Sequence, residues 1–155
     1  MVSFIKAEDC DGEIFVEIQN KSFKEDYLRY GECPGYGRTL KNMIVSMKKN
    51  IQYKIMLNDI PVGKVSAHEE YDICHLDCLC VISQYENQGI GQKAVKFIES
   101  QLPNAKSWNL ETPSDKKRNH HFYIKCGYEI TAEKMDGNVK VVIFSKTMNK
   151  QELIQ

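Results

Sequence analysis

The feature that most constrains the fold of this sequence is a pair of glycines between an apolar run and an amphipathic segment. Residues 73–82 carry few polar side chains, as expected of a strand that is buried on both faces. Gly89 and Gly91 follow, and apolar residues then recur at helical spacing, at Ile90, Ala94, Val95, Ile98 and Leu102. The sequence therefore predicts a strand, a glycine-containing turn and a helix in direct succession.

A turn of this kind is suited to binding an anion. Glycine allows a tight turn and a close approach of a ligand to the backbone, and the first amide groups of a helix have no acceptor within the helix. The third glycine of the dinucleotide-binding pattern is missing, because position 94 is alanine, and the GxxxxGK[ST] phosphate loop is absent. The turn is thus predicted to bind a phosphate of another type of ligand.

The remaining patterns predict a mixed α/β chain in the order β-α-α-β-β-β-α-β-α-β-β. Strands are expected at residues 2–6, 51–57, 60–68, 73–82, 108–112, 128–135 and 139–148. Helices are expected after a cap at Asp9 with Cys10, Ile14 and Ile18 on one face, over the apolar positions 40–47, from Gly89 to Leu102, and from Pro113 to Gly127 with Phe122 and Cys126 on its apolar side. Three glycines and a proline in residues 30–37 predict a loop. We see no repeat and no boundary, so we expect a single domain over residues 1–155.

Composition and charge narrow the function classes. Lys+Arg and Asp+Glu both number 21, so the basic excess of a broad nucleic-acid-binding surface is missing. No apolar run approaches the roughly 18 residues that would cross a bilayer, and the N-terminus does not resemble a signal peptide. The six cysteines fit no zinc motif and are expected to be reduced thiols. We therefore expect a cytoplasmic protein that binds neither nucleic acid, membrane nor metal.

Two motifs resemble a known family. Residues 79–91, ending in Glu86-Asn87-Gln88-Gly89-Ile90-Gly91, resemble the acetyl-coenzyme A loop of the GNAT family of N-acetyltransferases, Gln/Arg-x-x-Gly-x-Gly/Ala after the fourth strand. Residues 119–128, which include Phe122-Tyr123-Ile124-Lys125-Cys126-Gly127-Tyr128, resemble that family's Phe-Tyr-x-Lys-x-Gly-Phe/Tyr segment. The order of elements also matches, so the resemblance covers essentially the whole chain.

The resemblance implies a fold and a co-substrate. The fold is a mostly antiparallel sheet of about seven strands with about four flanking helices, in which the fourth and fifth strands are parallel and splay apart. The co-substrate is acetyl-coenzyme A, without a metal. The residues implied to contact it are Val81, Ile82, Gln88, Gly89, Ile90, Gly91, Gln92 and Asn119. The sequence departs from the family at Glu86, where Gln or Arg is usual, and at Lys116, where many members have Asn.

The same resemblance gives Tyr123 a catalytic role. It corresponds to the tyrosine that protonates the coenzyme A thiolate in many members, and a phenol with a pKa near 10 suits that donation. The alternative interpretation is a core tyrosine beside Phe122.

The general base is left open between several groups. Asp77 is a charge within an apolar strand, where burial would raise its pKa. Glu111 ends a strand and matches the glutamate of the ribosomal-protein alanine acetyltransferases. His75, a weaker candidate, shares the strand face of Asp77 by alternation. Asp77 and Glu111 are expected to face one cleft where the two strands diverge, and a water chain without a protein base remains an alternative.

The acceptor is the least determined part. The family binds it between the first two helices and at the last hairpin, which here gives residues 23–38. That segment holds acidic and aromatic residues suited to a cationic amine, namely Tyr27, Tyr30, Tyr36, Glu25, Asp26 and Glu32. An ordinary surface loop is the alternative, and polyamine, amino sugar, amino acid and protein N-terminus all stay open as acceptors.

The resemblance therefore implies an acyltransferase that acts on a primary amine of a small molecule or a peptide, by direct attack in a ternary complex. We expect a monomer or homodimer. The alternative is a coenzyme A-binding module of the same fold without catalysis.

Overall fold

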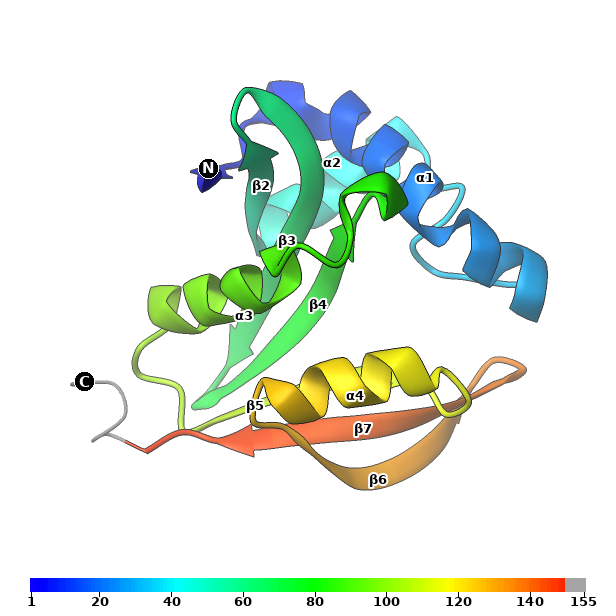
Figure 1. The fold of residues 1–155 in the computed structure, drawn as a ribbon, viewed down its shortest axis with the longest axis vertical. Helices are drawn as coiled ribbons and strands as arrows, with labels where there is room; N and C mark the ends of the chain where they lie inside the picture. Colours follow the sequence, from blue (N-terminus) through cyan, green and yellow to red (C-terminus); the bar gives the residue numbers. More distant parts are fainter. Residues whose placement is uncertain (150–155) are drawn as a thin grey trace. The chain divides into compact units, whose positions relative to one another are not determined.

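A computed structural model describes residues 1–149, and within them seven strands form one mixed sheet in the order β1-β2-β3-β4-β5-β7-β6 (Figure 1). The strands are β1 (Val2–Lys6), β2 (Ile51–Leu57), β3 (Ile60–Glu70), β4 (Ile73–Val81), β5 (Ser107–Pro113), β6 (Glu129–Asp136) and β7 (Val139–Thr147). The helices are α1 (Gly12–Tyr30), α2 (Leu40–Lys49), α3 (Ile90–Gln101) and α4 (Lys117–Lys125), with short 3-10 turns η1 (Asp9–Asp11) and η2 (Ser83–Tyr85). The pair β4/β5 is parallel, whereas β1/β2, β2/β3, β5/β7 and β6/β7 are antiparallel. The predicted fold class and element order are confirmed.

The chain forms two compact units. The first comprises residues 1–68 and 77–98, and the second comprises residues 69–76 and the part of the chain after residue 98. Strand β4 therefore contributes its first residues to one unit and its last residues to the other. That residues 1–155 form a single domain stays a prediction. Residues 150–155 lie outside the described part of the chain.

The first unit has its core under the first two helices. Phe15 and Ile18 of α1, Met43 of α2 and Cys80 of β4 form a buried cluster. The predicted apolar face of Cys10, Ile14 and Ile18 is wrong at its start, because residues 9–11 form a 3-10 turn with Glu8, not Asp9, at its N-cap. Cys10 belongs to that turn and is exposed, whereas Ile18 is buried beside Phe15 and Ile14 packs against the same cluster, as predicted.

Strand β4 corrects a second expectation. It is not buried on both faces: Cys74, Leu76 and Cys80 are buried, whereas Ile73 and Asp77 are exposed. The polar residue Asp77 lies on the open face, where its carboxylate keeps contact with water. The apolar composition of this segment therefore did not mean burial on both faces. The strand stays open to solvent around Asp77, whose carboxylate would be costly to bury without a partner.

The second unit packs α4 across one face of β5, β7 and β6 (Figure 1). Trp108, Leu110 and Phe144 form its core, and Leu110 lies opposite Phe144 in the β5/β7 register. The buried residues of α4 are His120 and Tyr123, not the predicted Phe122 and Cys126. Strand β5 continues to Pro113 and the helix spans only Lys117–Lys125, so Cys126 lies at its C-cap, and packing on the sheet decides which face of the helix is buried.

Candidate active site

The glycine turn has the predicted construction. The amide of Ile82 donates to the carbonyl of Val62 at 2.8 Å and holds the end of β4 on β3. Asn87 and Gly89 then adopt left-handed backbone angles, with φ of 64° and 77°, and α3 begins at Ile90. Left-handed angles are easily adopted by glycine and tolerated by asparagine, so both residue types suit their positions.

The start of α3 presents backbone donors. The amide of Lys93 donates to the carbonyl of Gly89 at 3.2 Å, which closes the first helical turn. The amides of Ile90, Gly91 and Gln92 come before this first hydrogen bond, so the helix itself offers them no carbonyl acceptor. A Cβ built on Gly89 would meet no atom within 4 Å, so the backbone is open on that side. The helix dipole adds positive potential at the same place, and the turn can bind a phosphate.

The first unit brings most of the expected cofactor residues together. Val81 and Ile82 are half-buried at the end of β4, directly before η2 and the turn. Glu86, the departure from the family pattern, is also half-buried. Asn119 belongs to the second unit, where its side-chain amide donates to the Thr112 hydroxyl at 3.0 Å and ties α4 to β5.

Tyr123 is a core residue of the second unit. It is 8% exposed. Its ring lies 5.0 Å from that of Phe122, 5.7 Å from that of Phe144 and 6.0 Å from that of Tyr128. The ring of Tyr123 therefore packs in the core, as the alternative interpretation expected. The role of its hydroxyl in catalysis stays a prediction.

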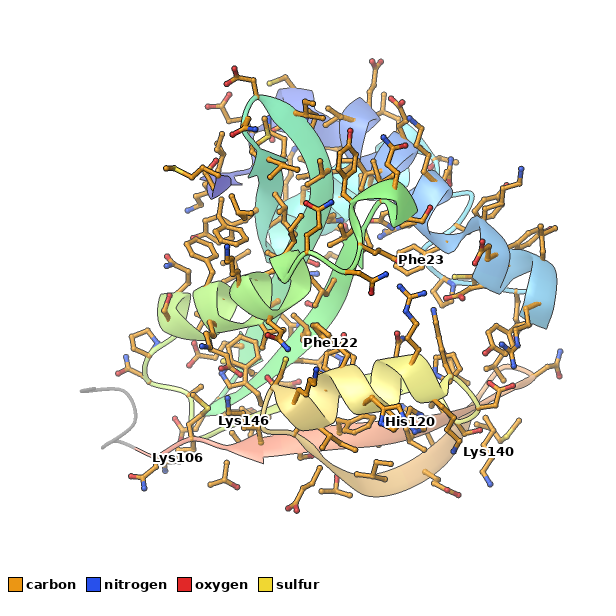
Figure 2. The ribbon with its side chains drawn as sticks, in the orientation of Figure 1. Phe23, Lys106, His120, Phe122, Lys140 and Lys146 are labelled. Atoms are coloured by element: carbon orange, nitrogen blue, oxygen red, sulfur yellow. The ribbon has the colours of Figure 1, made fainter. Side chains whose placement is uncertain are left out.

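A buried polar network, which the sequence did not reveal, supports this ring. The Tyr128 hydroxyl donates to Glu99 Oε2 at 2.8 Å, and Lys146 Nζ donates to Glu99 Oε1 at 3.0 Å and to the carbonyl of Cys126 at 3.0 Å. Burial, followed by the charge of Glu99, raises the pKa of Tyr128. The Tyr128 amide also donates to the carbonyl of Tyr123 at 3.0 Å. The network thus fixes the end of α4, where Figure 2 shows Lys146 beside the helix.

Each of the candidate bases has a partner. Both carboxylate oxygens of Asp77 lie 2.8 Å from Nδ1 of His68 on β3, and within residues 1–149 Asp77 forms no ion pair with a lysine or arginine. Glu111 pairs with Lys134 at 2.6 Å, and this contact raises the pKa of Lys134. His75 Nδ1 contacts Asn109 Oδ1, its register partner on β5. Asp77 and Glu111 fall in different units, so their expected common cleft stays a prediction.

The loop between α1 and α2 is folded back on α1. The Gln19 amide donates to the carbonyl of Gly35 at 3.0 Å, and the rings of Tyr27 and Tyr36 stack at 4.6 Å. A Cβ on Gly35 would lie 2.6 Å from the ring of Phe23, which projects from α1 in Figure 2. The predicted acceptor segment is therefore a packed structure, and Gly35 is the residue that lets Phe23 contact it.

Lys64, in the middle of β3, is the buried charge that sequence reasoning missed. It is 1% exposed, its Nζ donates to Gln19 Oε1 at 2.7 Å, and it lies 5.0 Å from the centre of the Phe15 ring. Desolvation lowers its pKa. Gln19 thus joins Lys64 to the loop carbonyl of Gly35. A single lysine in a strand gives no local signal that helices will cover it.

Within residues 1–149 no group of three or more His, Cys, Asp and Glu side chains is arranged to hold a metal ion. In the same part of the chain, no helix combines the length and the apolar character that crossing a membrane requires.

Comparison with known proteins identifies the family. Residues 15–128, more than half of the chain, match the acetyltransferase (GNAT) family. The chain therefore belongs to the GNAT acetyltransferase family. This confirms the resemblance to the family that was drawn from the two motifs.

Solved structures share the fold at low sequence identity. PaiA N-acetyltransferase from Thermoplasma acidophilum, in complex with coenzyme A, has a TM-score of 0.80 at 16% identity, over 96% of this chain and 99% of that one. The ribosomal-protein-S18-alanine N-acetyltransferase from Escherichia coli has a TM-score of 0.77 at 13% identity, over 95% and 94%. Aminoglycoside acetyltransferase AAC(6')-Ib, in complex with coenzyme A, has a TM-score of 0.75 at 19% identity, over 98% of both chains.

A shorter but closer sequence match involves the uncharacterized protein YrkN of Bacillus subtilis (strain 168). The two chains are 46% identical over 56 residues, which cover 36% of this chain and 30% of that protein. This chain thus matches less than a third of that relative's length.

Proposed function

We propose that this protein transfers the acetyl group of acetyl-coenzyme A to a primary amine of a small molecule or a peptide, by direct attack in a ternary complex. The observation that carries the proposal is the β4–turn–α3 unit. There, Gly89 is left-handed and open, and the amides of Ile90, Gly91 and Gln92 precede the first helical hydrogen bond. In a chain of this family, that unit supports binding of the cofactor's pyrophosphate.

The residues around the turn fit acetyl-coenzyme A. The amides of Gln88 to Gln92 would hold the pyrophosphate, and the edge of β4 at Val81 and Ile82 would pair with the pantetheine arm. Asn119 keeps its side-chain oxygen and one of its two side-chain N–H donors for the cofactor, because the other N–H donates to Thr112. When bound, the cofactor supplies the thioester, whose carbonyl carbon accepts the amine.

Tyr123 is the proposed general acid. Its hydroxyl would give a proton to the coenzyme A thiolate as the carbon–sulfur bond breaks. Packing against Phe144 and Tyr128 limits the positions that the ring can adopt, which favours a fixed direction for the hydroxyl. Asp77 and Glu111 remain the carboxylates proposed to assist removal of the amine proton, directly or through water.

The cellular compartment and the oligomeric state of the protein are also proposed here. None of the six cysteines, all of which lie within residues 1–149, forms a disulfide. Free thiols fit a reducing cytoplasm. We propose a cytoplasmic monomer or homodimer, which sedimentation at several concentrations would establish.

An acceptor screen tests the proposed function. Release of coenzyme A thiol would be followed with acetyl-coenzyme A and four amines: spermidine, kanamycin, lysine and a peptide with an N-terminal alanine. We expect turnover with at least one class, and Tyr123→Phe should lower it roughly 10²-fold or more while cofactor affinity stays unchanged. Cofactor binding without thiol release in any reaction would favour the non-catalytic module. Turnover of Tyr123→Phe within a factor of two would make Tyr123 structural.

A further inference from the structure

The His68–Asp77 pair has the geometry of a base and its orienting carboxylate. His68 projects from β3 and Asp77 from β4, within the same unit. Nδ1 of His68 lies 2.8 Å from both carboxylate oxygens. The imidazole is 38% exposed and the carboxylate 22% exposed, so a ligand can reach the ring.

The partner fixes which ring nitrogen carries a proton. An ionised carboxylate only accepts hydrogen bonds, so Nδ1 must be the donor. In the neutral imidazole the lone pair is then on Nε2, which becomes the basic atom. Asp77 also stabilises the imidazolium that forms when Nε2 takes a proton, as the carboxylate of a catalytic triad does.

We propose that His68 is the general base of the acetyl transfer and that Asp77 is a positioning residue that acts through it. The proposal rests on the proposed function. It assigns the catalytic role to a residue of β3 that sequence reasoning did not select, and it gives Asp77 a different task from the one predicted.

The proton transfers balance around the amine. The neutral amine attacks the thioester carbonyl, the new nitrogen–carbon bond forms, and the nitrogen gives a proton to Nε2 of His68. The carbon–sulfur bond then breaks and the thiolate takes a proton from Tyr123, the proposed acid. His68 returns its proton to solvent, from which Tyr123 is reprotonated, so the net products are amide and thiol.

The position along β4 is compatible with this step. Asp77 precedes Val81 by four residues, about 13 Å at the rise of an extended strand. The reacting amine lies at the thioester, so a chain of waters along β4 would carry its proton over the remaining distance to Nε2.

Other charged groups surround the pair. Lys64 from β3, Cys78 from β4 and Arg38 from the loop before α2 interact electrostatically here. Desolvation lowers the pKa of Lys64 and the hydrogen bond with Cys80 lowers the pKa of Cys78, and the charge of Asp77 opposes both shifts. Lys64 and Cys78 are therefore coupled electrostatically to Asp77, the partner of His68. A pH profile must therefore be read from variants and not from the wild type alone.

The test compares pH profiles of kcat/KM with the fastest amine of the screen and saturating acetyl-coenzyme A. His68→Gln should lower kcat/KM roughly 10²-fold or more and remove the acid limb of the wild-type profile. Asp77→Asn should cause a smaller loss and move the acid limb to lower pH, because removing the carboxylate destabilises the imidazolium. His121→Gln, an exposed histidine on α4, is the matched control and should leave the profile unchanged.

A second measurement guards against a folding defect. His68→Ala should retain wild-type affinity for acetyl-coenzyme A by calorimetry, and added imidazole should restore part of its turnover. An unchanged profile in His68→Gln would overturn the proposal and leave the acetyltransferase intact. Loss of the acid limb in Asp77→Asn but not in His68→Gln would make Asp77 the base and also overturn it. Absence of turnover in the wild type would overturn both proposals.

Discussion

Replacing Tyr128 by phenylalanine removes one hydroxyl from the network behind Tyr123. The hydroxyl donates to the buried carboxylate of Glu99 at 2.8 Å, while Lys146 continues to bind the same carboxylate at 3.0 Å. A hydrogen bond to a charged group contributes about 1.5–3 kcal/mol to stability. At about 2–4 °C per kcal/mol for a domain of this size, Tyr128→Phe should lower Tm by roughly 3–12 °C.

The pH dependence of this loss has a definite sign. The pKa of Tyr128 is raised in the folded protein above its ordinary value of 10.0, by burial and by the charge of Glu99. Below pH 10 both states keep the proton and the full contribution is present. Above pH 10 only the unfolded chain loses it, so this contribution falls by about 1.4 kcal/mol per pH unit. The difference between wild type and Tyr128→Phe should therefore shrink as the pH rises.

Urea unfolding at about pH 7, 9 and 11 measures both effects. Tyr71→Phe is the control, because Tyr71 is 91% exposed and its hydroxyl should contribute little at any pH. A Tyr128→Phe loss below about 0.5 kcal/mol at pH 7 would show that the hydroxyl is not bound as the structure has it. A loss that stays constant to pH 11 would contradict the raised pKa.

Three shorter predictions concern the first unit. Gly89→Val should weaken acetyl-coenzyme A binding about tenfold or more in calorimetry, because φ of 77° is strained for a β-branched residue; unchanged affinity would move the phosphate site elsewhere. Gly63→Ala should destabilise by about 2 kcal/mol or more in urea, because its Cβ would lie 2.3 Å from the carbonyl oxygen of Cys80; wild-type stability would refute that close approach. Lys64 has a pKa below its ordinary 10.5, so the unfolded state binds more protons between the two values and wild-type stability should rise with pH in that window; Lys64→Met should lack this rise, and equal pH slopes would contradict a desolvated amine.

Local patterns predicted the elements well. The glycines at 89 and 91, the helical repeat after them and the alternating strands depend on neighbours in sequence, and the structure confirms their order. Both α1 and α4 begin later than the cap at Asp9 and the proline at position 113 suggested, so Cys10 falls in a 3-10 turn, and α4 buries His120 and Tyr123 instead of the predicted residues. Helix starts are set by which backbone groups find partners, and a 3-10 turn or an extended strand can satisfy them first.

Side-chain partners of the candidate site could not be predicted in the same way. His68 and Asp77 are 9 residues apart, Glu99 and Tyr128 are 29 apart, and Gln19 and Lys64 are 45 apart. Each contact depends on the register of two elements and on the direction of two side chains. The sequence selected Asp77 because a carboxylate within an apolar run is conspicuous, whereas its partner His68 lies in a strand of mixed composition and is not.

Strand β3 shows what kind of signal would have found His68. Its even-numbered residues Lys64, Ser66 and His68 make a polar row, which alternation would assign to solvent. The structure buries Lys64 and Ser66 to 1% exposure, and Ser66 lies opposite Gln52, which is also buried. Polar groups on a covered face cost free energy, and they are retained where they bind or orient something. The row under α1 and α2 ends at the half-exposed His68, whose Nδ1 contacts Asp77, so the polar row of β3 leads to the proposed base more directly than the lone carboxylate of β4 does.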